Sequence, residues 1–175
     1  MSTGKAIFMA GLAGIFWKMS QATASSNLVQ SQPQVSQLVL DTLKKPRLSD
    51  VDPIMIQAMI KIESNNNPLA ARYEPHLGEA SLGLMQVLPS TAKWLASDMG
   101  YTYYGRIIKD DQLLEPEIAV YFGAAFVDWL KTWKGKTRSE QWIVESYNGG
   151  PNNSNSQTQN HWRKYQEAKA KILRG

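Results

Sequence analysis

Apolar residues recur at spacings of three and four over several stretches of the chain, a pattern that predicts amphipathic helices. The clearest stretch follows Glu115 and Pro116, a pair suited to the start of a helix. Its apolar positions are Ala119, Phe122, Phe126, Leu130 and Trp133. We therefore predict that the segment beginning at Glu115 forms the longest helix and the centre of the core.

A second helix is predicted to begin at Pro53, with Asp52 as its N-cap. Its buried stripe consists of apolar residues at i, i+4 and i+7, namely Met55, Met59 and Ile62. Three consecutive asparagines and Pro68 end this helix, because asparagine favours turns and proline disfavours helical backbone before it. Glu63 consequently lies in the last turn, where it closes an otherwise apolar face.

Two effects are expected to raise the pKa of Glu63. Desolvation against the apolar stripe disfavours the ionised carboxylate, and the negative end of the helix dipole acts in the same direction. A carboxylic acid that keeps its proton near neutral pH can serve as the general acid of glycosidic-bond cleavage, because the leaving sugar oxygen is too basic to depart unprotonated. The alternative is that Glu63 merely ends the helix and points to water.

Four further helices complete a mainly α prediction. One of them could lead into the domain from residues 25–45, a stretch that is otherwise interpreted as a linker rich in Ser and Gln. The others are expected over residues 91–99, 139–147 and 161–173. In the last of these, the residues expected to face inward are Trp162, Tyr165, Ala168 and Ile172. We place the folded domain at residues 46–175.

The composition favours a globular protein and excludes several kinds of site. A chain of 175 residues with 43% hydrophobic content and six Trp can bury a substantial core. The absence of Cys excludes disulfides, thiolate metal sites and cysteine nucleophiles. A net charge of +4 is too small and scattered to indicate nucleic-acid binding. His76 and His161 are too isolated to suggest a metal site, and no cofactor is expected; both are interpreted as surface or hydrogen-bonding residues.

Residues 1–24 are interpreted as a signal or targeting segment. Lys5 precedes an apolar run over residues 6–17, and Ala22-Thr23-Ala24 resembles a cleavage site with small residues. The run is too short to span a bilayer as a helix. Export or secretion is therefore expected. Because Lys18 directly after the run is unusual for a signal peptide, organelle targeting or a retained membrane anchor are the alternatives.

Three short segments, in this order, resemble the signature segments of the soluble lytic transglycosylase family. They are Glu63-Ser64, Gly83-Leu84-Met85-Gln86 and Tyr147-Asn148-Gly149-Gly150. The resemblance covers roughly residues 50 to 152. It implies a lysozyme-like helical fold with a substrate cleft between helices, and cleavage of the MurNAc-GlcNAc β-1,4 bond of peptidoglycan. We expect a monomer that acts on peptidoglycan or a related glycan polymer, with membrane contact only through the N-terminal segment if it is retained.

By this resemblance, Glu63 acts first as an acid and then as a base. It would protonate the glycosidic oxygen and then take the proton from the C6 hydroxyl of the same muramyl residue, which closes a 1,6-anhydro ring without a second carboxylate. The residues implied to line or shape the substrate site are Ser64, Met85, Gln86, Tyr147 and Asn148. The phenol of Tyr147 could hydrogen-bond the Glu63 carboxyl, or Tyr147 could be a core residue whose hydroxyl reaches water.

The chain departs from the family pattern between the first two segments. Gly83 lies twenty positions after Glu63, more than is usual, and the extra length falls in a loop at residues 73–79 that contains Glu74 and Glu79. Either acid could serve as a second carboxylate and make the protein a hydrolytic muramidase or a chitinase-like enzyme, as in the similar goose-type lysozymes. The alternative is that both acids are simply solvated.

Two further interpretations concern sugar binding. The tyrosines of residues 101–105 could stack on sugar rings, or they could simply pack the loop that carries them. A glycan-binding protein without turnover is the competing function class, and it would fit if Glu63 were ionised and solvent-facing.

Overall fold

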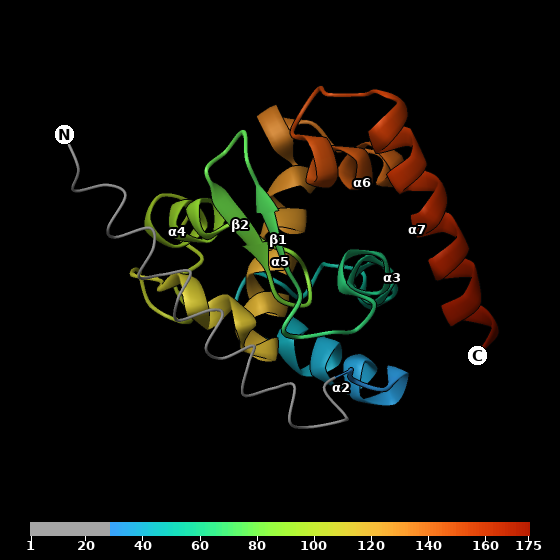
Figure 1. Ribbon diagram of the computed structural model, residues 1–175, viewed down its shortest axis with the longest axis horizontal. Helices are drawn as coiled ribbons and strands as arrows, with labels where there is room; N and C mark the ends of the chain where they lie inside the picture. The colour runs from blue at the N-terminus through green and yellow to red at the C-terminus, as the bar shows by residue number, and fades with distance from the viewer. Residues whose placement is uncertain (1–28) are drawn as a thin grey trace.

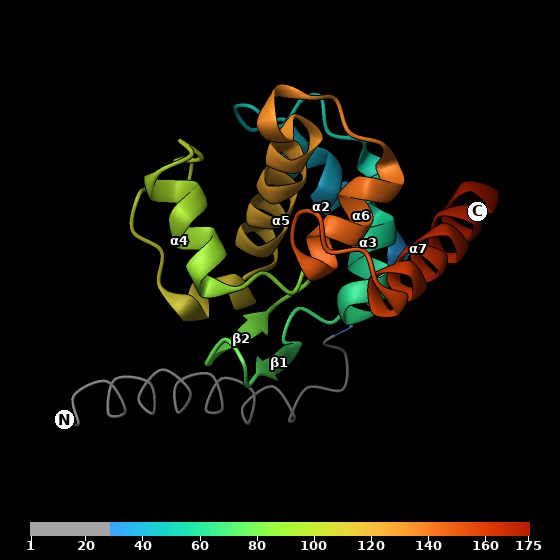
Figure 2. The ribbon, with the colours of Figure 1, turned by 90° about the horizontal axis from the view of Figure 1, so that it is seen from above.

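The computed structural model describes residues 29–175, and its central element is helix α5 (Pro116–Lys131). Pro116 stands in the first turn, and Phe122, Ala124 and Leu130 are fully buried. Figure 2 shows α5 between α4 on one side and α2, α6 and α7 on the other. The remaining helices are α2 (Gln32–Leu43), α3 (Pro53–Ser64), α4 (Pro89–Ser97), α6 (Glu140–Gly149), α7 (Ser156–Arg174) and the 3₁₀ turns η1 (Asp110–Leu114) and η2 (Trp133–Gly135). The predicted mainly helical fold is confirmed.

The prediction that α5 is the longest helix is wrong, because α5 has 16 residues and α7 has 19. Helix α7 begins at Ser156, five positions before the expected start at His161. The side chain of Asn155 caps it by accepting hydrogen bonds from the backbone N–H groups of Gln157 and Thr158. Its first residues are mainly polar, so the apolar spacing does not show where the helix starts.

Helix α2 belongs to the packed core. Residues 32–37, interpreted from composition as linker, form its first turns. Val35 and Val39 are fully buried, and α2 packs on α3 and α5. Between α2 and α3, the Gln57 side-chain oxygen accepts hydrogen bonds from Gln32 Nε2 at 3.0 Å and Ser36 Oγ at 2.8 Å. The possible leading helix is therefore present, and the core extends ahead of residue 46. Residues 1–24 lie outside the described part of the chain.

The segment expected to be a loop at residues 73–79 is the tip of a β-hairpin. Strands β1 (Ala71–Glu74) and β2 (Glu79–Leu82) pair antiparallel, with Glu74 opposite Glu79. Figure 2 shows the hairpin projecting at one edge of the helical body. Each strand has four residues and β1 is largely exposed, so no apolar alternation reveals it in the sequence.

The turn after the hairpin lies unusually close to the core. Gly83 has a φ of 72°, and a Cβ atom at this position would lie 1.9 Å from the carbonyl oxygen of Leu113. Met85 is fully buried, and its side chain occupies the space left by Gly123 of α5. The backbone of residues 83–86 is thus held between the hairpin and the central helix. No helix within residues 29–175 combines the length and apolar character required to cross a bilayer.

Replacement of Gly83 by Ala is expected to destabilise the protein far more than replacement of Gly78 by Ala. Both glycines have φ near 70°, so both variants carry the strain of a left-handed backbone, about 1–2 kcal/mol. Only Gly83 also lacks space, because nothing lies within 4 Å of a Cβ atom at Gly78. Chemical denaturation should show a free energy of unfolding lower by about 2 kcal/mol or more in Gly83→Ala than in Gly78→Ala. Equal losses would contradict the close approach to Leu113.

Candidate active site

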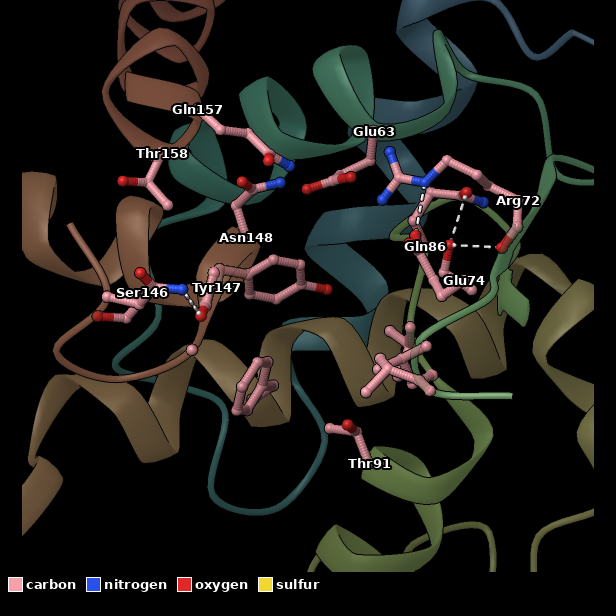
Figure 3. Close-up of a pocket in the computed structure, with 18 of the residues that line it drawn as sticks. Glu63, Arg72, Glu74, Gln86, Thr91, Ser146, Tyr147, Asn148, Gln157 and Thr158 are labelled. Atoms are coloured by element: carbon pink, nitrogen blue, oxygen red, sulfur yellow. Dashed lines mark hydrogen bonds and ion pairs between the residues drawn. The ribbon is translucent and has the colours of Figure 1, made fainter. Parts of the chain in front are cut away.

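A pocket with a volume of about 430 Å³ lies where α3, the hairpin, α6 and the start of α7 meet. Figure 3 shows this pocket with the side chains that line it. The predicted site residues among them are Glu63, Glu74, Gln86, Tyr147 and Asn148. The structure therefore brings together residues from all three signature segments. Within residues 29–175, no three acidic or histidine side chains gather in a way that could hold a metal ion.

Glu63 enters the pocket from the last turn of α3. The helix ends there because Asn65 adopts the left-handed conformation with a φ of 52°. Only 6% of the Glu63 side chain is exposed, so the alternative in which it points to water is wrong. In Figure 3 the carboxyl group points toward the side of the pocket that carries Asn148 and Gln157.

Tyr147 stands at the end of α6 and connects that helix to the Gly83–Gln86 turn. Its hydroxyl donates a hydrogen bond to the carbonyl oxygen of Met85 at 2.8 Å. The structure does not contain the predicted bond from this phenol to Glu63, because the hydroxyl is used by the backbone of the turn. Burial raises the pKa of Tyr147 well above its ordinary value, and the nearby negative charge of Glu63 raises it further. The phenol is therefore a permanent donor.

Gln86 lines the pocket, but its side-chain amide is already occupied. The Nε2 atom donates to the carbonyl oxygens of Ala70 and Gly83, each at 3.0 Å. The Oε1 atom accepts a hydrogen bond from Ser81 Oγ at 3.1 Å. Gln86 thus fixes the base of the hairpin against the turn, and it shapes the pocket wall through this network.

Two other predicted substrate residues lie behind the pocket wall. The Met85 side chain packs against α5, and the Ser64 hydroxyl donates to the carbonyl oxygen of Ile60 at 3.1 Å. Neither residue lines the pocket, so neither would contact a ligand bound there. Asn148 does line it, and its buried Oδ1 atom has no hydrogen-bond partner among the described residues.

The two acids of the hairpin have different surroundings. Glu74 lines the pocket, has a side chain 20% exposed, and accepts a bond from Arg72 Nε at 2.7 Å. Glu79 lies outside the pocket wall and accepts bonds from the backbone N–H of Ser90, at 3.0 Å, and from the Ser90 hydroxyl. Glu79 therefore stabilises the start of α4, where a carboxylate also complements the helix dipole. Of the two candidates for a second carboxylate, the structure places only Glu74 at the pocket.

His161 is the residue at this site that the sequence interpretation missed. Its Nε2 atom lies 3.1 Å from Glu63 Oε1, and only 11% of its side chain is exposed. The interpretation of His161 as a surface or hydrogen-bonding residue did not predict its largely buried position beside Glu63. The sequence did contain a signal that His161 faces inward. His161 precedes Tyr165 by four residues and Ala168 by seven, so the three share one face of the helix, and Tyr165 and Ala168 are buried.

The tyrosines of residues 101–105 do not line the described pocket, so they contribute no sugar contact within it. Tyr101 is buried and donates a hydrogen bond to Asp128 at 2.8 Å, with the guanidinium of Arg47 4.0 Å from its ring centre. Tyr103 and Tyr104 pack against each other and against Tyr121 of α5. Packing of the loop, the alternative interpretation, accounts for these rings.

The structure is that of a mainly helical, lysozyme-like domain with a largely buried carboxyl in a pocket between its helices. The family model of the transglycosylase SLT domain matches residues 43–171. The chain therefore belongs to the transglycosylase SLT domain family, as the sequence resemblance predicted. This membership supports a peptidoglycan substrate and lytic transglycosylase-type activity in general. A comparison with curated proteins found no match.

Replacement of Tyr147 by Phe is expected to lower the free energy of unfolding by about 1–3 kcal/mol at pH 7, because the Met85 carbonyl loses its partner. The difference from wild type should shrink above about pH 10. Above that pH, Tyr147 of the unfolded chain ionises, while the buried Tyr147 of the folded protein keeps its proton. The contribution of Tyr147 to the free energy of unfolding is therefore complete below the ordinary pKa of tyrosine and is lost as the pH rises.

Denaturant titrations of both proteins at several pH values measure this difference. Tyr103→Phe is the control, since the Tyr103 ring is half exposed and its hydroxyl accepts a bond from the flexible side chain of Lys45. A loss in Tyr147→Phe no larger than in the control would contradict a structural role for the bond to Met85.

Proposed function

We propose that the protein cleaves the MurNAc-GlcNAc β-1,4 bond of peptidoglycan by lytic transglycosylation, with Glu63 as the general acid and then the general base. The observation that carries the proposal is the position of Glu63, a carboxyl with 6% side-chain exposure that lines a pocket of about 430 Å³. Membership of the SLT family supports the substrate. The volume lies within the range of about 300–1,000 Å³ that small-molecule sites occupy, so the pocket would hold only the part of a glycan strand near the cleaved bond.

The reaction requires two proton transfers through the same carboxyl. Glu63 gives its proton to the glycosidic oxygen while the bond from that oxygen to the muramyl C1 breaks, and the GlcNAc side leaves with a free 4-hydroxyl. The resulting carboxylate takes the proton of the muramyl C6 hydroxyl, whose oxygen attacks C1 and closes the 1,6-anhydro ring. Glu63 ends in its starting protonated form, and no water is consumed.

The surroundings of Glu63 suit this sequence of steps. The pocket wall beside it contains Tyr147 and Asn148. These groups could orient a sugar ring, and neither of them is a second carboxylate that would activate water. Limited exposure of the carboxyl also restricts competing attack by water.

Hydrolysis with Glu74 as the base is the second candidate, and the placement of Glu74 in the pocket wall is the observation that favours it. Glu74 Oε1 is paired with Arg72 Nε at 2.7 Å, however, so only the other oxygen of Glu74 is left to activate water. Glu79 is not proposed for this role, because both of its oxygens accept bonds from Ser90.

Digestion of purified sacculi tests the leading proposal, with the released muropeptides analysed by mass. Wild-type protein is expected to release products that lack the mass of one water relative to hydrolysis products. Glu63→Gln should reduce the rate about 10²-fold or more, since the amide cannot donate the required proton. Glu167→Gln, an exposed position on α7, is the matched control and should retain the wild-type rate.

Glu74→Gln separates the two candidate reactions. Under the leading proposal, the variant still forms 1,6-anhydro products, and the rate changes only modestly because the partly exposed pair with Arg72 contributes little. Fully hydrated reducing ends from the wild type, lost in Glu74→Gln, would instead establish the hydrolase. Parallel digestion of chitin oligosaccharides tests the substrate class. Binding of sacculi without cleavage, unchanged in Glu63→Gln, would defeat both enzymatic proposals.

The proposal also requires that the protein reach peptidoglycan. We propose export, or targeting to an organelle that contains such a polymer, on the basis of the targeting pattern in residues 1–24.

A further inference from the structure

The contact between His161 and Glu63 joins two buried polar side chains from helices far apart in the sequence. His161 Nε2 and Glu63 Oε1 are 3.1 Å apart, with side-chain exposures of 11% and 6%. Nε2 has no aligned hydrogen-bond partner among the described residues, so its contact with the carboxyl is a close approach at 3.1 Å without an aligned hydrogen bond. A buried polar nitrogen without a partner is costly, and the Glu63 carboxyl is the acceptor placed beside it.

The other acidic groups on the helices around α7 have partners of their own. On α6, Glu140 accepts bonds from Tyr165 and Lys169. Glu145, also on α6, accepts bonds from Gln141 at 2.7 Å and Ser154 at 3.1 Å. The carboxyl beside His161 is therefore that of Glu63, the proposed acid and base.

The position of His161 is fixed by the packing of α7. This helix lies along α3 and α6, as Figure 1 shows. One turn beyond His161, the ring of Tyr165 is fully buried and its hydroxyl donates to Glu140. The ring of Trp162 stacks on that of Tyr165 at 5.4 Å between centroids. The imidazole is consequently held by a rigid element and has little freedom to leave the carboxyl.

We propose that His161 is a positioning residue, which holds the Oε1 atom of Glu63 and leaves the other carboxyl oxygen for the substrate. This inference rests on the proposed function and deepens it. A glutamate side chain has several rotatable bonds, and each must be fixed before its proton can be delivered in line. His161 lies outside the pocket lining, so it acts through Glu63 and does not touch the glycan.

The imidazole of His161 would also help Glu63 to change from general acid to general base. After the first proton transfer, Glu63 is a carboxylate in a largely buried position, where an isolated charge is unfavourable. A ring N–H group near Oε1 stabilises that ionised form until the C6 hydroxyl arrives. The same carboxyl can then act as the base, as the one-carboxylate reaction requires.

Kinetics of two substitutions at position 161 test the positioning role. His161→Leu should lower kcat about 10- to 100-fold and leave KM within about twofold, because the substrate still binds but the carboxyl is misplaced. His161→Gln, whose side-chain N–H can reach the place of Nε2, should retain activity within about threefold of wild type. Gln166→Leu, an exposed position on the same helix, controls for polar-to-apolar replacement on α7. A kcat in His161→Leu equal to that of the control would overturn the proposal.

A second measurement needs no enzymatic activity. The chain contains two His, and His76 is exposed in the hairpin turn, so the imidazole nitrogen signals of the full-length protein can be assigned by comparison. In Glu63→Gln, the Nε2 signal of His161 should shift more than the signals of His76, which lines the same pocket from the hairpin turn. An unchanged His161 signal would overturn the contact on which the proposal depends.

The two measurements distinguish the possible failures. If wild-type protein releases no product from sacculi, the proposed function fails, and a positioning role in that reaction fails with it, whatever the spectrum shows. If wild-type protein cleaves but His161→Leu keeps its kcat, only the inference about His161 fails. A shifted His161 signal together with a lowered kcat in His161→Leu, restored in His161→Gln, supports both.

Discussion

The backbone of residues 83–86 approaches the core so closely that a side chain at Gly83 would collide with the Leu113 carbonyl oxygen, 1.9 Å from its Cβ position. The rest of the site depends on this contact. Met85 fills the space beside Gly123, and the Met85 carbonyl accepts the hydrogen bond of Tyr147 at 2.8 Å. One turn of backbone therefore sets the distance between α5, the hairpin and the end of α6, and with it the shape of the pocket.

Burial of Glu63 is the second constraint, and it links stability to chemistry. A largely buried carboxyl is unfavourable when ionised unless polar groups surround it. Here the polar group beside the carboxyl comes from α7, in the form of His161 at 3.1 Å. The helix that bears the carboxyl and the helices that surround it must pack together before the acid has a defined environment. Helix α7 is thus part of the site as well as of the core.

The hairpin accounts for the unusual separation of the first two signature segments. Its added length forms two short strands whose acids have structural partners: Glu79 binds the start of α4, and Glu74 pairs with Arg72. Gln86 closes the base of the hairpin through three hydrogen bonds. The insertion therefore extends one wall of the pocket while leaving the position of Glu63 to α3.

Local patterns were sufficient to predict the mainly helical fold, the bounds of α3 and the place of Glu63 in its last turn, because capping residues and apolar spacing act over one or two turns of chain. They did not reveal the hairpin, whose strands are short and exposed, or the early start of α7, whose first residues are mainly polar. The partners of each polar group were decided only by tertiary packing. The Tyr147 hydroxyl binds Met85, Glu79 binds Ser90, and His161 meets Glu63 across 98 positions of sequence. Hydrogen bonds and ion contacts form over about 3 Å, so they depend on how whole helices pack, which spacing along one segment cannot specify.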